Sequence, residues 1–260
     1  MAERYAIIGD VIAEERHAEI VPGGSGAIAL AVRQLDVEVT LRSRIGTDTN
    51  GDAVMSALKA ARIHPKHIDR VDGATCTQTR QDDGSITDWQ EGVLMTKGGV
   101  MDIYALFGHS ALVLDLLDQP LRHFLIDLPA HTDGNVRMLT TLSYLDHLEP
   151  RADELEVAMR CDTIVGTEAQ FAQLTGEERA SDALGLIFDR MPLTHLRAAV
   201  AITSGGLEII ARDTRVLKPV QDAVPNLLLP QVVAGIAWGM AHHADWDAAA
   251  EASLDPESVA

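Results

Sequence analysis

The chain has 260 residues, of which 39 are Asp or Glu and 21 are Lys or Arg, so its formal charge is −18 at neutral pH. A nucleic-acid-binding face needs clustered cations to neutralise phosphates, and an anionic membrane surface would repel this excess of carboxylates. Hydrophobic residues make up 47% of the chain, enough for a large buried core. We therefore expect a single domain over residues 1–260, with neither a nucleic-acid nor a membrane partner.

The N-terminal residues lead directly into the short apolar run 6–9, without the basic and long apolar regions of a signal peptide. All apolar stretches are also shorter than the roughly 20 residues of a membrane-spanning helix. These features predict a cytoplasmic protein. Cys76 and Cys161 are far apart and lack metal-ligand spacing, so we expect buried, reduced thiols.

Short apolar runs bounded by turn residues alternate with stretches of helical period. The predicted strands are residues 5–8, 38–45, 103–107, 123–127, 163–165, 198–203 and 207–212. The predicted helices are residues 26–35, 52–61, 110–117, 135–145, 152–160, 168–174, 180–190 and 232–242. Such alternation is typical of βαβ units and predicts an α/β sandwich, with a mostly parallel central sheet and helices on both faces.

One segment interrupts this alternation. Residues 75–80 and 86–91 are polar, alternating and rich in Thr, and the linker 81–85 contains an Asp-Gly turn pair. We predict a β-hairpin within a small β lid that spans residues 73–98. The pattern leaves three interpretations open: a solvated surface hairpin, a lid over a ligand cleft, and a sheet that forms a homodimer.

Two glycine-containing segments are candidates for ligand binding. Residues 22–26 read Pro-Gly-Gly-Ser-Gly and open an apolar helix, where glycines let a ligand approach backbone N–H groups at the positive end of the helix dipole. A purely structural turn explains this segment equally well. Residues 44–52 follow a strand and begin another helix. His109 and Asp115 are further contact candidates, because they lie near the sheet edge where α/β proteins usually bind ligands.

Together, residues 22–26 and 44–52 resemble the first signature of the ribokinase-like PfkB family of carbohydrate and nucleoside kinases. The resemblance continues in order over roughly residues 4–250. Ile126-Asp127, or the literal Asp133-Gly134-Asn135-Val136-Arg137, is similar to the family's Asp-x-Asn-x-Arg element. Residues 161–176 are similar to its Asn-x-x-Glu magnesium segment, and residues 203–206 to its Thr-x-Gly nucleotide loop.

The resemblance implies a ribokinase-like fold with a β lid, a sugar or nucleoside substrate, and ATP and Mg²⁺ as cofactors. The substrate-binding residues that it implies are Glu14, Gly23, Gly24, Ser25 and Asp127. The implied nucleotide-binding residues are Thr203, Gly205 and Gly206, and the implied metal ligand is Glu168.

The chain departs from the family at its chemical centre. In the family, a Gly-Ala-Gly-Asp element supplies backbone amides that form an anion hole, and its Asp takes the proton of the attacking hydroxyl. The corresponding residues 224–231 read Val-Pro-Asn-Leu-Leu-Leu-Pro-Gln, with neither Gly nor Asp. Depending on the alignment, Pro230 or Leu228 stands in place of the Asp. No catalytic residue occupies the expected position, and Asp222 and Glu168 are the candidates that remain.

Two other elements depart as well. The sugar-contacting Asn falls on Ala27 or Ile28, and the Asn and Glu of the magnesium motif fall on Thr167 and Gln170. We therefore predict a family member whose ATP-dependent phosphorylation of a sugar or nucleoside is weak or lost. One alternative is a non-catalytic binding or regulatory pseudokinase that dimerises through its lid. Another is an active kinase that uses Asp222 or Glu168 as its base.

Overall fold

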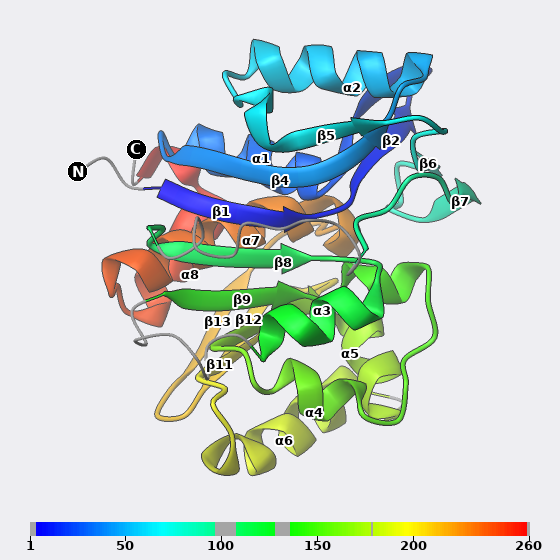
Figure 1. Ribbon diagram of the computed structural model, residues 1–260. Coiled ribbons are helices and arrows are strands. Elements are labelled where there is room, and N and C mark those ends of the chain that lie inside the picture. Colours follow the sequence, from blue (N-terminus) through cyan, green and yellow to red (C-terminus); the bar gives the residue numbers. More distant parts are fainter. Residues whose placement is uncertain (1–3, 97–107, 128–135, 178, 259–260) are drawn as a thin grey trace.

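The computed structural model describes residues 4–96, 108–127, 136–177 and 179–258 (Figure 1). Its strands are β1 (Arg4–Gly9), β2 (Val11–Arg16), β3 (Glu19–Gly24), β4 (Glu38–Gly46), β5 (Ile68–Val71), β6 (Thr77–Arg80), β7 (Ile86–Gln90), β8 (Ala111–Asp115), β9 (Arg137–Thr141), β10 (Thr163–Thr167), β11 (Ala198–Thr203), β12 (Gly206–Ala211) and β13 (Arg215–Pro219). Its α-helices are α1 (Ser25–Gln34), α2 (Thr49–Ala60), α3 (Gln119–Ile126), α4 (Glu154–Ala158), α5 (Glu168–Thr175), α6 (Ala180–Arg190), α7 (Pro225–His242) and α8 (Trp246–Leu254).

Within this described part, nine strands form the main sheet in the order β13-β12-β11-β10-β9-β8-β1-β4-β5. Every neighbouring pair from β5 to β11 is parallel, whereas the pairs β11–β12 and β12–β13 are antiparallel. The mostly parallel α/β architecture predicted from the alternating pattern is therefore confirmed. In such a sheet the carboxyl ends of the parallel strands share one edge, and that edge is where ligands bind.

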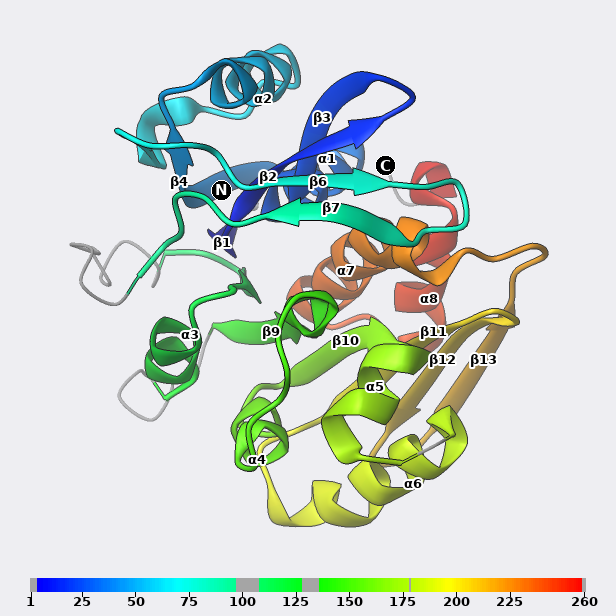
Figure 2. The same ribbon diagram turned by 90° about the vertical axis from the view of Figure 1, so that its right-hand side faces the viewer.

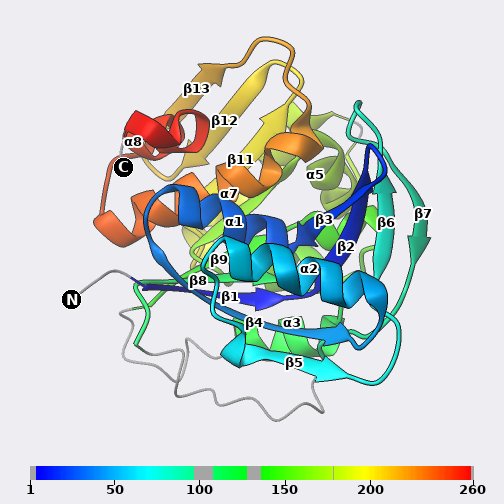
Figure 3. The same cartoon turned by 90° about the horizontal axis from the view of Figure 1, so that it is seen from above.

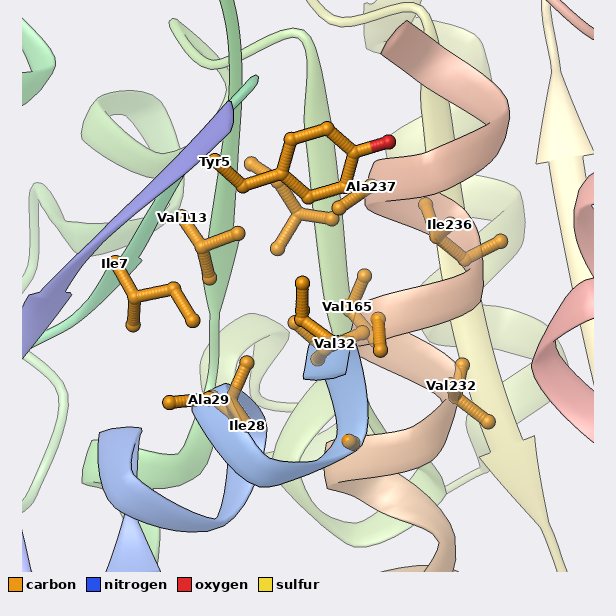
Figure 4. Packing of buried hydrophobic residues seen from close by; sticks show 14 of the residues in the cluster. Tyr5, Ile7, Ile28, Ala29, Val32, Val113, Val165, Val232, Ile236 and Ala237 are labelled. Atoms are coloured by element: carbon orange, nitrogen blue, oxygen red, sulfur yellow. The ribbon is translucent and has the colours of Figure 1, made fainter. Parts of the chain in front are cut away.

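Helices pack on both faces of the main sheet (Figures 1 and 3). Tyr5 and Ile7 of β1 face α1 and α7, together with Val113 and Val165 of neighbouring strands (Figure 4). The alternate β1 residues, Ala6 and Ile8, belong to the cluster on the face covered by α3. Because successive strand residues point to opposite faces, strands buried on both faces read as continuous apolar runs.

Five of the predicted strands and five of the predicted helices agree with elements of the structure. The strands predicted at 5–8, 38–45, 163–165, 198–203 and 207–212 correspond to β1, β4, β10, β11 and β12. The helices predicted at 26–35, 52–61, 152–160, 168–174 and 180–190 correspond to α1, α2, α4, α5 and α6. The strand predicted at 103–107 lies outside the described residues.

Three predicted elements are wrong in type. The helix predicted at 110–117 is the strand β8, whose five residues are all buried. The strand predicted at 123–127 is the helix α3, which Asp118 caps by accepting a hydrogen bond from Leu121 N. The helix predicted at 135–145 contains the strand β9, followed by a short 3-10 helix. Short apolar runs fit a buried strand and a buried helix equally well, and here the tertiary packing decided between them.

The C-terminal helix predicted at 232–242 begins earlier than expected, at Pro225. Proline is favoured at the first position of a helix because its missing N–H would be unpaired there, and Pro225 takes that place in α7. The helix α8 follows and packs along α7, with Gly235 of α7 close to Ser253. Among the described residues, no helix combines the length and apolar character that crossing a membrane requires.

The predicted hairpin exists as β6 and β7, and it belongs to a second sheet with the order β3-β2-β6-β7. Strands β2 and β3 follow directly after β1, so the second sheet is larger than the lid predicted at residues 73–98, of which 97 and 98 lie outside the described residues. Figure 2 shows this sheet projecting from the main body beside the start of α7. We call these four strands the lid.

Candidate substrate pocket

A pocket lies between the lid and the carboxyl ends of the central strands. The lid contributes Glu14, Gln78 and Arg80, while Asp10 stands just after β1 and Asp115 ends β8. From the main body come Ser143, Asp146 and His147, and from α7 come Asn226, Leu229 and Pro230. The pocket has a volume of about 50 Å³. Charged and polar side chains thus converge on it, and Leu229 and Pro230 of α7 form an apolar wall on one side.

Asp10 connects the lid to the main sheet. Its carboxylate accepts hydrogen bonds from Met95 N, at 2.7 Å, and from Leu117 N, at 2.8 Å. Burial raises the pKa of Asp10 to about 7, and the charge of Asp115 acts in the same direction. Sequence analysis did not identify this residue. The signal that the sequence offered was the position of Asp10, directly after the apolar run 6–9.

Asp115, a contact candidate from the sequence, lies at the carboxyl end of β8 and lines the pocket. Its Oδ1 atom accepts a hydrogen bond from Thr141 Oγ1 at 2.6 Å and another from Ser143 Oγ. Burial raises the pKa of Asp115, while these two hydroxyl donors partly oppose that effect. The second carboxylate oxygen has no such donor among the described residues, which leaves it for a ligand.

Asp146 offers a second carboxylate on the same side of the pocket. Its Oδ1 atom accepts a hydrogen bond from Gln170 Nε2 at 2.8 Å. Burial raises the pKa of Asp146, and the nearby Asp115 adds to the rise. Both carboxyl groups therefore hold a proton more readily than a solvent-exposed Asp does.

The positions expected for the magnesium motif have a structural role here. Thr167 caps α5: its hydroxyl accepts from Gln170 N at 3.3 Å, and Gln170 Oε1 accepts from Thr167 N at 2.9 Å. This reciprocal capping box uses the polar atoms that a metal site would need. Glu168 is the first residue of α5 and does not line the pocket. Among the described residues, no group of three His, Cys, Asp or Glu side chains could hold a metal ion.

Glu14 is buried within the lid and binds its neighbours tightly. Arg80 Nε donates to Glu14 Oε2 at 2.9 Å, and Gln78 and Arg16 also donate to this carboxylate. Burial alone would raise the pKa of Glu14, but the charges of Arg80 and Arg16 hold it below its ordinary value. Glu14 therefore stays ionised and orients three pocket-lining side chains of the lid, those of Arg16, Gln78 and Arg80.

The glycines predicted to bind substrate allow close packing around these carboxylates. A Cβ atom on Gly23 would approach Glu14 Cβ to 3.0 Å, and one on Gly24 would approach Asp10 O to 2.5 Å. Gly24 also has a φ of +54°, a backbone conformation that favours glycine. Of the three predicted residues in this turn, Gly24 lines the pocket, whereas Gly23 and Ser25 lie behind it.

Two contacts between the lid and the main body lie beside the pocket. The lid's turn residue Gly84 accepts hydrogen bonds through its carbonyl oxygen from Arg80 Nη1 at 3.0 Å and from Asn226 Nδ2 at 3.2 Å. On the other side, Trp89 of β7 stacks on His147. Burial, assisted by the charge of Arg80, lowers the pKa of His147 to about 4, so this ring is neutral at physiological pH. These contacts hold the lid over the cavity.

The apolar wall follows from how α7 begins. The helix starts at Pro225, and Val224 caps it without a side-chain hydrogen bond. Leu229 and Pro230 therefore lie inside the helix. A backbone N–H at such a position points along the helix axis rather than into the pocket, and proline has no N–H at all. This wall offers the pocket neither free backbone amides nor a titratable side chain.

Other predicted site residues lie elsewhere. Asp127 follows α3 rather than a strand, and its carboxylate forms an exposed ion pair with Arg160 at 2.6 Å. Asp222 is exposed in a turn before α7. Asp133 and Asn135 lie outside the described residues, and Arg137 begins β9 away from the pocket.

The predicted nucleotide loop forms the tight turn between β11 and β12. Thr203 Oγ1 accepts a hydrogen bond from Gly205 N at 3.1 Å and donates to Gly206 O at 3.2 Å. Gly206 has a φ of +132°, and a Cβ atom there would meet Lys218 O at 2.1 Å. All three residues are outside the pocket lining.

The chain matches a known protein family over most of its length. The pattern of the pfkB family carbohydrate kinases matches residues 2–223. Among curated proteins, nothing matches the chain.

Several solved structures share the fold. A ribokinase from Arabidopsis thaliana complexed with ribose and ATP matches with a TM-score of 0.70 at 16% identity, over 98% of this chain and 92% of that one. A Vibrio cholerae fructokinase with bound fructose, ADP and calcium matches with a TM-score of 0.69 at 15% identity, over 96% and 92% of the two chains. A Burkholderia thailandensis nucleoside kinase in complex with inosine gives 0.68 at 14% identity, over 96% and 88%.

Proposed function

Because this chain belongs to the pfkB family of carbohydrate kinases, we propose that its lid-covered pocket binds a sugar or a nucleoside. Asp115 and Asp146 each use one carboxylate oxygen for a protein donor, so the other can accept a hydrogen bond from a ligand hydroxyl. Arg80 and Asn226 add donors at the lid side. This mixture of convergent acceptors and donors suits a polyhydroxylated molecule.

Phosphotransfer by this pocket is weak or lost. The observation that carries this part of the proposal is the apolar wall of Leu229 and Pro230 inside α7, in the segment where the family places its anion hole and base. The positions of the family's magnesium motif also lack its usual ligands. Thr167 and Gln170 stand there, and both are used in a capping box.

One observation favours a second candidate, an active kinase with a relocated base. Asp115 and Asp146 line the pocket with raised pKa values, and a raised pKa makes a carboxylate a stronger base toward a hydroxyl proton. In this alternative one of these carboxylates takes the proton of the substrate hydroxyl. Asp222 and Glu168, the bases considered from the sequence, do not line the pocket.

A paired experiment separates the two candidates. Thermal shifts are measured with ribose, fructose and inosine, and turnover is measured with the same compounds plus ATP and Mg²⁺. For the binding protein we expect a sugar or nucleoside to raise Tm without nucleotide, with no turnover above background. Turnover that Asp146→Asn or Asp115→Asn reduces by at least 100-fold would instead establish the relocated base, since acid–base groups contribute about 10²–10⁴-fold. Asp72→Asn, on an exposed turn, is the control.

A homodimer through the lid stays a prediction. In the lid, β3 and β7 are the edge strands, and β7 presents exposed Thr87 and Asp88. Asp88 has a φ of +51°, which interrupts the regular hydrogen-bonding edge that a paired strand would need. Sedimentation over a hundredfold range of concentration tests the dimer, and a monomer throughout would contradict it.

A further inference from the structure

A second cleft lies at the amino ends of the central strands, the edge opposite the lid pocket. It has a volume of about 630 Å³, within the range of small-molecule binding sites. Arg137 begins β9, Thr163 begins β10 and Arg197 precedes β11, while Arg212 follows β12. The end of α7 and Trp246 at the start of α8 complete it, and Figure 1 shows α8 beside this end of the sheet. We call it the amino-edge cleft.

Positive charge predominates in this cleft although the whole protein carries −18. Three arginines line it together with His195 and His243, against the carboxylates Asp162 and Asp213. Asp162 is shared between two of the arginines, at 3.4 Å from Arg137 Nη1 and 3.1 Å from Arg197 Nε. One carboxylate therefore compensates two guanidinium groups. The C-terminal carbonyls of α7 oppose an anion, and the histidines add charge when protonated.

Arg212 carries the charge that no carboxylate compensates. Its Nε donates to Leu196 O at 3.1 Å and its Nη2 to Thr194 O at 2.7 Å. Among the described residues it forms no ion pair. Because two carbonyl oxygens fix the guanidinium plane, its Nη1 atom is held in place with its donors available. Thr163 also belongs to the cleft lining, and its buried hydroxyl has no hydrogen-bond partner in the described part of the chain.

We propose that the amino-edge cleft binds a small molecule that carries a phosphate group. Pre-oriented guanidinium groups match the oxygens of a phosphate monoester, with which they form paired, charge-assisted hydrogen bonds. Arg197 uses Nε for its bond to Asp162, which leaves both of its Nη atoms for a ligand, and Arg212 has Nη1 left. Two arginines on different loops can therefore contact one ligand. The cleft volume exceeds that of a bare ion, and Trp246 offers an apolar surface for the rest of the molecule.

Titration calorimetry on the full chain tests this proposal. The probes are inorganic phosphate and ribose 5-phosphate, with ribose as the uncharged comparison, at low salt. We expect both phosphates to bind and ribose 5-phosphate to quench tryptophan fluorescence, a signal that Trp246→Phe removes. Arg212→Gln and Arg197→Gln should each weaken binding about tenfold or more, because each removes a hydrogen bond to a charged group. Arg212→Lys keeps the charge and should retain part of the affinity.

Arg215→Gln is the matched control, because Arg215 is an exposed arginine on β13 that pairs with Glu208 outside the cleft. It should leave the affinity unchanged within twofold. Tm of every variant is measured, and Arg212→Lys stands in if Arg212→Gln does not fold. Three results would each overturn the proposal: no binding of either phosphate at millimolar concentration, wild-type affinity in both cleft variants, or a loss in the control as large as in the cleft variants. Wild-type affinity in both cleft variants would place the phosphate outside this cleft.

Discussion

Trp89 of the lid stacks on His147 of the main body, with ring centroids 4.0 Å apart and planes inclined by 26°. This contact joins β7 to the loop after β9, two segments that have no strand pairing with each other. His147 is held neutral by its burial, so the stacking does not depend on pH near neutrality. The pair therefore joins the lid to the main body across the neutral pH range.

Replacing Trp89 with Ala should loosen the lid while leaving the main sheet intact. A stacked aromatic pair contributes about 0.5–1.5 kcal/mol beyond its buried area. We expect faster hydrogen exchange in residues 77–90, unchanged exchange in β10 and β11, and weaker ligand binding in the pocket. Thr87→Ala, on the exposed side of β7, is the control. Uniformly faster exchange throughout the chain would show that Trp89 supports the whole fold instead.

Gly24→Ala should be strongly destabilising. A Cβ atom there would lie 2.5 Å from Asp10 O, and the positive φ adds strain of about 1–3 kcal/mol. Denaturant unfolding measures the loss, and binding of sugar should fall with it. In contrast, Gly185→Ala in α6 meets no atom within 4 Å and should stabilise the protein by about 0.5–1 kcal/mol. Equal effects of the two substitutions would contradict this assignment.

Arg122 and Glu154 form a buried ion pair that positions the segment after β8. Arg122 Nη2 lies 2.8 Å from Glu154 Oε1, and its Nη1 donates to Leu116 O at 2.6 Å, next to the Leu117 amide that Asp10 accepts from. Arg122→Ala should cost about 3–5 kcal/mol in unfolding free energy, because Glu154 would remain buried without its partner. Arg160→Ala, which breaks the exposed pair with Asp127, should cost at most about 1 kcal/mol.

Asp10 should make stability fall as pH rises from about 4 to 7. Its pKa is raised from 3.8 to about 7 by burial, so in this window the folded state holds a proton that the unfolded state releases. Folding is then favoured at the acid end, and the contribution is lost as pH approaches the folded-state pKa. Relative to Asp10→Asn, the wild-type free energy of unfolding should decrease by about 1.4 kcal/mol per pH unit in this window. A constant difference between the two proteins would refute the raised pKa.

Sequence patterns predicted the elements whose residues carry unambiguous signals. Strand β11 is an almost continuous apolar run, and α6 shows helical period over its length. The predicted types of β8 and α3 were the reverse of those in the structure. Both segments are short and apolar, so whether each forms a strand or a helix depends on which neighbours bury it. The Asp118-Gln119-Pro120 start of α3 was the local signal that would have separated them.

The pocket was predicted only in part, for a similar reason. Glu14, Gly24 and Asp115 were identified and line it, whereas Asp10, Asp146 and Arg80 were not. The bonds from Asp10 to Met95 and Leu117 join residues 85 and 107 positions apart in the chain. Such contacts arise from the order of strands in the sheet, which no local pattern encodes.

The small volume of the pocket bears on how a ligand enters it. At about 50 Å³ it is well below the roughly 300 Å³ of typical small-molecule pockets, so we expect the Trp89–His147 and Asn226–Gly84 contacts to open when a sugar binds. Association would then be gated: at high ligand concentration its observed rate should level off at the opening rate of the lid. A bound molecule would leave through the same opening, so these two contacts would limit its release as well as its entry.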